Sequence, residues 1–155
     1  PVLSPTPSPA AALVPERLRD APFESLVEVC PAALSVTGSI ASALKDRGGV
    51  ALIIDYGYTQ SQPGDSLQAM ASHAFVDVFE TPGQADITAH VDFEALARAA
   101  TETAVFPPVE QGAFLISLGI HARANALKVH ATEAQAHGRH ICRNIPFPEL
   151  WSRIE

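Results

Sequence analysis

The chain has 155 residues, of which 47% are hydrophobic and 17% are charged. This apolar share is enough for a folded core, so global disorder is disfavoured, and the length predicts one domain. The net charge of -7 at pH 7 disfavours nucleic acid or an anionic membrane as the main partner, because both repel an acidic surface. No apolar run approaches the roughly 20 residues that cross a bilayer, so we expect no membrane span.

Proline dominates the beginning of the chain. Residues 1–22 hold six of the thirteen prolines, and those at 5, 7 and 9 alternate with Thr or Ser. This pattern blocks regular helix and central strand. We predict a linker or extended surface segment over 1–22, with a short helical turn over 15–20. The ordered part is expected to begin with a strand-like run over 25–29.

A helix and a strand are predicted next. Pro31 suits the first turn of a helix, and apolar residues recur at helical spacing up to Leu44, with Thr37 and Ala41 on the same face. Gly48-Gly49 ends that helix. The run Val-Ala-Leu-Ile-Ile at 50–54 follows without polar alternation. Such a run predicts a strand covered on both faces, as in parallel α/β sheets.

The second half is predicted to be loop and helix. Turn signals at 62–65 and 82–83 indicate a loop-rich stretch over 58–89. Asp92 can cap a helix, and 111–128 predicts one or two helices with Gly119 at the joint. Their buried side chains are expected to be Phe114, Leu115, Leu118 and Leu127. A capping-box pattern at 132–135 predicts another helix. The order favours α/β, with fewer strands than the five or more of a doubly wound sheet.

Cysteine and histidine usage gives little support for a metal site. Cys30 and Cys142 lie far apart, and two reduced thiols in a cytoplasmic protein are favoured over one disulfide. The phrase His137-x-x-His140-x-Cys142 has the ligand types of zinc. Zinc sites need four ligands at recognised spacing and the sequence has no second cluster, so we expect no metal. No Ser-His-Asp phrase or phosphate loop occurs in the sequence.

Several phrases share their order and spacing with one family. They are VEVCP at 27–31, GGVALIIDYGY at 48–58, GDSLQA at 64–69 with His73, PGQADITAHVDF at 82–93, and QGAFL at 111–115 followed by LGI at 118–120 and Arg123. Over about residues 1 to 136 the chain resembles the MidA family, whose mitochondrial member is a complex I assembly factor and arginine methyltransferase. The resemblance implies a Rossmann-like class I methyltransferase fold with an inserted hairpin region.

The resemblance covers only the later strands and helices of that fold. The family's glycine-rich cofactor loop belongs to its amino-terminal half, and this sequence has no such phrase. We therefore expect 23–136 to be the carboxyl-terminal half of a methyltransferase domain whose parent uses S-adenosylmethionine, and the isolated chain to be inactive. The tail, 137–155, departs from the family, and a shifted reading frame or a natural truncation is our hypothesis for it.

Two predicted site residues follow the 50–54 strand. Ligands bind open α/β sheets at the carboxyl ends of strands. With the resemblance, this predicts that Asp55 and Tyr56 face the cofactor or substrate cleft, Asp55 as a catalytic residue and Tyr56 in substrate binding. The alternative is that Asp55 caps the following turn while Gly57 supplies a positive φ.

The remaining site predictions rest on polar residues in the family-like phrases. His90 can exchange protons near neutral pH and is predicted to be catalytic, with Asp92 orienting substrate. The alternative is a helix cap for Asp92 and a packed or solvated ring for His90. Glu28 could bind an arginine guanidinium through a bidentate pair, or it is an ordinary surface carboxylate. Gln68 and Gln111 are candidates for substrate hydrogen bonds.

The function predicted from these residues and the resemblance is methyl transfer to a protein arginine. The implied substrate is a protein, and the location is cytoplasmic for a bacterial source or mitochondrial for a eukaryotic one. The alternative is a non-catalytic assembly module, because half a sheet presents an unpaired edge. It would form a homodimer or pair with the missing amino-terminal half. An α/β domain of unrelated function is a third alternative.

Overall fold

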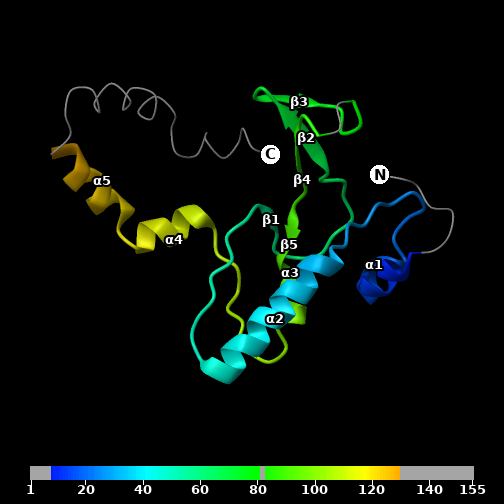
Figure 1. Cartoon of the computed structure of the whole chain (residues 1–155), viewed down its shortest axis with the longest axis horizontal. Helices are drawn as coiled ribbons and strands as arrows, with labels where there is room; N and C mark the ends of the chain where they lie inside the picture. The colour runs from blue at the N-terminus through cyan, green and yellow to red at the C-terminus, as the bar shows by residue number, and fades with distance from the viewer. Residues whose placement is uncertain (1–7, 81–82, 130–155) are drawn as a thin grey trace. The chain divides into compact units, whose positions relative to one another are not determined.

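The computed structural model describes residues 8–80 and 83–129 (Figure 1). The chain forms two compact units, residues 1–108 and residues 109–155. In the described part of the first unit, helical segments come first, a run of short strands follows, and a further helix comes last, so the structure is mixed α/β. In the described ranges, no helix is long and apolar enough to cross a bilayer. The predicted helix near 132–135, the tail 137–155 and Cys142 lie outside the described residues.

Two short helical segments occupy the proline-rich beginning. The 3-10 helix η1 (Pro9–Leu13) starts where the Ser8 hydroxyl accepts a hydrogen bond from the Ala10 N–H at 3.2 Å. Helix α1 (Glu16–Arg19) confirms the predicted turn over 15–20. The strand-like run expected over 25–29 is wrong, since these residues belong to no strand.

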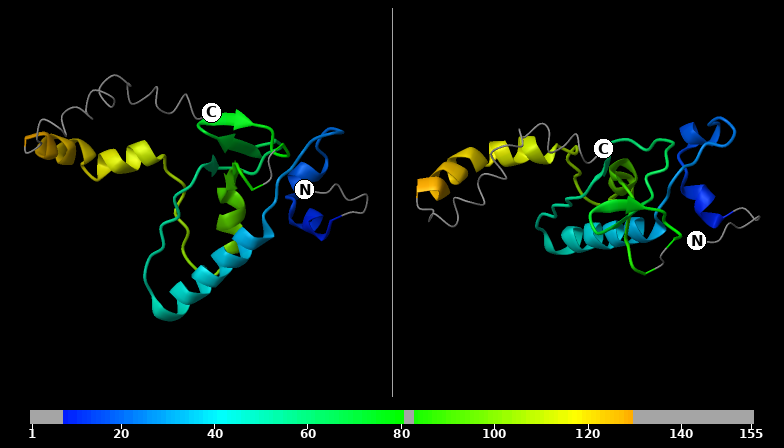
Figure 2. Two further views of the ribbon diagram at one scale, coloured as in Figure 1. Left: turned by 45° about the horizontal axis from the view of Figure 1, so that its top comes forward. Right: turned by 90° about the horizontal axis from the view of Figure 1, so that it is seen from above.

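Helix α2 (Pro31–Arg47) has the predicted ends. Pro31 stands in the first turn of the helix. The helix is capped at its carboxyl end by Gly48, whose φ of 70° suits glycine. Its buried residues are Thr37 and Ala41, on the predicted face. This face lies toward helix α3 (Phe93–Ala99), and Figure 2 shows the two helices side by side from two further directions. Among the described residues, the buried apolar side chains are those of Ala41, Ala69 and Leu96, so this core is small.

The prediction of a buried strand over 50–54 is wrong. The segment belongs to no strand, and its alternate residues Val50, Leu52 and Ile54 are 93%, 65% and 63% exposed. An apolar run is buried on both faces only where strands flank it and other layers cover it. The described residues provide no such neighbour at this point. Parallel pairing begins just afterwards, where strand β1 (Gly57–Tyr58) meets strand β5 (Val91–Asp92).

A three-stranded antiparallel sheet forms within the stretch predicted to be loop-rich. Its order is β3 (Ala74–Val76), β2 (Gln68–Ala71), β4 (Asp86–Thr88). Ser72 and His73 connect β2 to β3 with φ of 50° and 63°. Two successive positive φ values are typical of the turns that match strand twist, and Asn-Gly is their usual signal. Ser-His carries no such signal, so the turn residues did not place a hairpin here, although the family resemblance implied an inserted hairpin region.

The helical predictions for the remainder are confirmed in outline. Asp92 caps α3, because its Oδ1 accepts the Ala95 N–H at 2.9 Å. In the second unit, α4 (Gln111–Ser117) and α5 (Ile120–Val129) meet at Gly119, whose φ is 81°. The expected burial of Leu118 and Leu127 is wrong, since they are 67% and 53% exposed. Over residues 109–129, the described part of this unit, two short helices offer few surfaces for covering apolar side chains.

Candidate functional site

The parallel pair β1–β5 forms the centre of the candidate site. Gly57 stands opposite Val91, and the Val91 N–H donates to the Tyr56 carbonyl at 2.8 Å. A Cβ on Gly57 would lie 2.8 Å from the Val91 carbonyl carbon, 2.9 Å from its nitrogen and closer still to its oxygen. Gly57 is not among the glycines with positive φ, so the interpretation that it supplies a positive φ after Asp55 is wrong. Glycine is required here because the two backbones approach closely.

Ser66 joins the Glu28 segment to this centre. Its N–H donates to Glu28 Oε1 at 3.1 Å, and its hydroxyl donates to Oε2 of the same carboxylate. A further backbone bond, from the Gly64 N–H to the Leu26 carbonyl at 3.0 Å, holds the same two segments together. Both oxygens of Glu28 therefore have a donor. A carboxylate offers about four lone-pair positions, so each oxygen can accept one more hydrogen bond.

His90 is bound to the same serine. Its backbone N–H donates to Ser66 Oγ at 2.8 Å, so the hydroxyl bridges the Glu28 carboxylate and the His90 main chain. The His90 ring meets Tyr58 edge-on, with ring centroids 5.1 Å apart and planes at 64°. All four residues are half-buried. We call Glu28, Tyr58, Ser66 and His90 the serine-bridged cluster.

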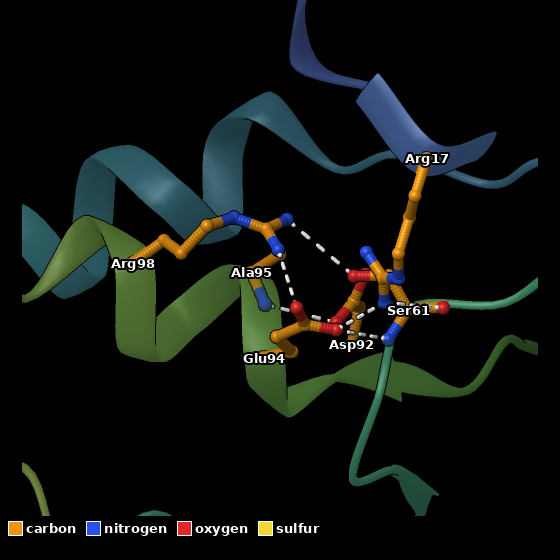
Figure 3. A network of polar contacts seen from close by, with 6 residues as sticks. All are labelled: Arg17, Ser61, Asp92, Glu94, Ala95 and Arg98. Atoms are coloured by element: carbon orange, nitrogen blue, oxygen red, sulfur yellow. Dashed lines mark hydrogen bonds and ion pairs between the residues drawn. The ribbon is translucent and has the colours of Figure 1, made fainter. Parts of the chain in front are cut away.

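A second polar network fixes the loop before Ser66 (Figure 3). Glu94 accepts the Ser61 N–H at 2.7 Å, and it forms ion pairs with Arg17 at 2.6 Å and Arg98 at 3.0 Å. The Ser61 carbonyl also accepts from Arg17 at 2.8 Å. The Ser61 N–H, followed by Arg17 and then Arg98, holds the pKa of the Glu94 carboxyl below its usual value. The loop 59–66 is thus tied at Ser61 as well as at Ser66.

Comparison with known proteins places the chain in a family. Residues 1–109 match the family model described as "Putative S-adenosyl-L-methionine-dependent methyltransferase". The chain belongs to this methyltransferase family. The serine-bridged cluster and the Glu94 network lie wholly inside the matched residues.

Several relatives carry one name. The chain is 40% identical over 136 residues to "Protein arginine methyltransferase NDUFAF7, mitochondrial" of Mus musculus, which covers 87% of this chain and 30% of the relative. The Homo sapiens protein of the same name is 36% identical over 128 residues, covering 81% and 28%. The Caenorhabditis elegans homolog is 36% identical over 116 residues, covering 74% and 27%. The matched part therefore spans less than a third of the length of these relatives.

The structure brings some of the predicted site residues of this methyltransferase-family chain together and separates others. Glu28 and His90 meet through Ser66, and Gln68 starts β2 two residues later. Asp55 is exposed, and its Oδ1 accepts the N–H of the adjacent Tyr56 at 2.8 Å.

The other three predicted residues have different surroundings. The side chain of Tyr56 is 56% exposed beside the β1–β5 pair. The Asp92 carboxylate is engaged as the helix cap of α3, as the capping alternative expected. Gln111 is the exposed first residue of α4 and lies in the other compact unit. The geometry therefore brings the Glu28 carboxylate and the His90 backbone to one serine hydroxyl.

Sequence reasoning did not single out the residues that connect these elements. Ser66 was visible only as part of a family-like phrase, and Tyr58 as the end of another. The sequence carried no signal that joins Ser61 to Glu94 or to Arg17, because these partners stand 33 and 44 residues away, whereas the Glu94–Arg98 pair is local. A serine has no chemistry that marks it as a bridge until both of its partners are placed.

The described residues do not fit the cofactor of the methyltransferase family. A nucleotide-type cofactor is usually held by a glycine-rich turn that opens a helix. The space beside Gly57 is filled by the Val91 backbone, and Gly48 ends a helix. Helix α2 follows Cys30 and begins with proline, which has no N–H to donate. Nor do residues 8–80 and 83–129 place three or more His, Cys, Asp or Glu side chains for a metal ion.

Proposed function

We propose that this chain supplies the protein-substrate side of an S-adenosylmethionine-dependent protein arginine methyltransferase. The observation that carries the proposal is the half-buried Glu28 carboxylate, which two hydrogen bonds from Ser66 orient. Both residues lie in the part of the chain that matches the family. The names of the relatives supply arginine as the acceptor. S-adenosylmethionine is the cofactor that the family description implies.

Glu28 has the chemistry to orient an arginine. A guanidinium is planar and presents paired N–H donors, which match the two oxygens of a carboxylate. Because Ser66 donates once to each oxygen, the carboxylate is held in one orientation and keeps free lone pairs. Glu28 would align the guanidinium, and this alignment is the main demand on the acceptor side of methyl transfer.

His90 is proposed to take the proton that the substrate guanidinium loses. Its imidazole is half-buried against Tyr58, and its backbone is held by the same hydroxyl that orients Glu28. An imidazole exchanges protons near neutral pH. Asp55, Tyr56, Gln68, Asp92 and Gln111 remain candidates for contacts with substrate. No role toward the cofactor is assigned to residues of this chain.

A chimera tests the proposed function. The segment of the Mus musculus relative that aligns with this chain is replaced by the corresponding residues of this chain. Tritiated methyl transfer from S-adenosylmethionine to an arginine-containing protein extract is then measured. We expect activity, a loss of at least about tenfold with Glu28→Gln, and normal activity with Asp46→Asn on the exposed end of α2. Full activity of Glu28→Gln would contradict the role of Glu28.

The isolated chain gives a complementary test. Because the described residues do not fit the cofactor, we expect no calorimetric signal with S-adenosylmethionine. Binding of S-adenosylmethionine at micromolar concentration by this chain alone would contradict the conclusion that its residues do not fit the cofactor.

We also propose that the 50–56 segment pairs with further strands, which would complete a Rossmann-like sheet. Its residues Val50, Leu52, Ile54 and Tyr56 are all more than half exposed. Such an apolar segment favours pairing with an amino-terminal portion of the domain, or with a second copy. Co-purification of a tagged amino-terminal portion of the mouse relative would support pairing. Light scattering that shows a monomer with a cooperative melt would argue against it.

The same exposed segment favours a second candidate function, a non-catalytic assembly module. The chimera separates the two proposals, since a module would bind the amino-terminal portion without supporting methyl transfer. The relatives' printed names place them in mitochondria. We propose a mitochondrial location for a eukaryotic source of this chain, and a cytoplasmic one for a bacterial source.

A further inference from the structure

The middle of the chain has a one-sided charge distribution. From Asp65 to His90 the sequence contains four Asp and Glu residues and no Lys or Arg. The three-stranded sheet lies wholly within this stretch. A surface with one sign of charge attracts partners of the opposite sign. Charge therefore favours a cationic partner for this sheet.

The sheet extends directly from the serine-bridged cluster. Strand β2 begins two residues after Ser66, and strand β4 ends two residues before His90. The hydrogen bond from the His90 N–H to Ser66 Oγ closes the base of the sheet at 2.8 Å. A chain bound along the sheet would therefore continue into the cluster.

One face of this sheet is open. The register sets Met70 opposite Phe75 on one side and opposite Asp86 on the other, so these three side chains share a face. Gln68 and Thr88 are paired on the same face nearer the cluster. Phe75 is 67% exposed and Met70 39%; on the opposite face Ala69 is 1% exposed and its partner Ile87 is 53% exposed. We call Gln68, Met70, Phe75, Asp86 and Thr88 the docking face.

We propose that the docking face binds a second arginine of the protein substrate, flanking the arginine that is methylated. The guanidinium would stack on the exposed Phe75 ring and pair with the Asp86 carboxylate. Arginine suits this combination better than lysine, because its planar group stacks and binds carboxylates through two donors. The inference rests on the proposed function for the identity of the substrate, but the binding itself needs no methyl donor.

The strand geometry sets the spacing between the two arginines. Met70, at the centre of the face, is four residues from Ser66, which corresponds to about 14 Å at the rise of an extended chain. An extended substrate advances by the same rise per residue. The flanking arginine is therefore expected about four residues from the arginine at Glu28.

Peptide binding to the whole chain tests the docking face. A fluorescent peptide of about ten residues carries two arginines about four residues apart, and its anisotropy is titrated with this chain. We expect Phe75→Ala and Asp86→Asn each to weaken binding about fivefold to tenfold. Replacing the flanking arginine with lysine should weaken it about threefold or more. Asp46→Asn removes the same charge from α2, away from the sheet, and should leave affinity within about twofold.

The outcomes separate this inference from the proposed function. Equal losses for Asp46→Asn and Asp86→Asn would overturn the docking face, since net charge alone would then explain binding. Self-association that Phe75→Ala abolishes would also overturn it, by showing a second copy on the face. A chimera that methylates substrate although the peptide variants bind equally would overturn the docking face and leave the function standing. Selective peptide binding with an inactive chimera would support the docking face and contradict the proposed function.

Discussion

Replacing Gly57 with alanine should separate β1 from β5. The new Cβ would lie 2.8–2.9 Å from backbone atoms of Val91, and backbone cannot rotate away as a side chain can. Overpacking of this kind costs about 1–3 kcal/mol. Loss of the hydrogen bond from the Val91 N–H to the Tyr56 carbonyl adds about 1 kcal/mol. We therefore expect the free energy of unfolding to fall by about 2–4 kcal/mol.

Gly38→Ala is the matched control within the same compact unit. Gly38 lies inside α2, and a Cβ there would lie 3.8 Å from the Ala99 carbonyl oxygen, an ordinary contact. Alanine should stabilise the helix by about 0.5–1 kcal/mol. Denaturant titration followed by circular dichroism measures both variants, and hydrogen exchange of the Val91 amide reports the pairing itself. Unchanged stability and unchanged Val91 exchange in Gly57→Ala would refute the close approach.

Three further predictions concern the polar contacts and the hairpin. Ser66→Ala removes the hydroxyl donor to Glu28 and should lower the free energy of unfolding by about 1–3 kcal/mol in denaturant titration, whereas an unchanged midpoint would contradict the bridge. Glu94 has a lowered pKa in the folded state, chiefly because of the Ser61 N–H, so it stabilises the fold above its unfolded pKa. That contribution is lost as pH falls through the folded pKa, and Glu94→Gln should remove this acid dependence from thermal melts. His73→Gly relieves a φ of 63° at the hairpin and should raise stability by about 0.5–1 kcal/mol, and a lower melting temperature would count against the turn.

The helices could be predicted from the sequence because their signals are local. A proline at the start and glycines at the end bounded α2, and Asp92 capped α3 by accepting the N–H of Ala95, three residues further along the chain. Gly119 marked the joint of α4 and α5 in the same way. Each signal acts through backbone groups a few residues apart, so it does not depend on tertiary contacts. The linked phrases that resembled a methyltransferase family were equally local, and the family is confirmed.

The strands could not be predicted in this way. The most apolar run, 50–54, indicated a buried strand, yet burial requires neighbours that the described residues do not provide. The stretch 58–89 carried turn signals, yet it forms a sheet through a Ser-His connection that lacks glycine. Strand formation depends on pairing partners, and a single segment contains little information about them.

The sequence by itself determined the helix boundaries, the family and the residue types from which a site can be built. Only the tertiary structure decided which of them meet: Ser66 joins Glu28 to His90 across 38 and 24 residues of chain, while Asp92 is engaged as a cap and Asp55 binds its own neighbour. The physical reason is that a hydrogen bond depends on distance and angle in space. A residue's type states what it can donate or accept, and the fold alone supplies the partner.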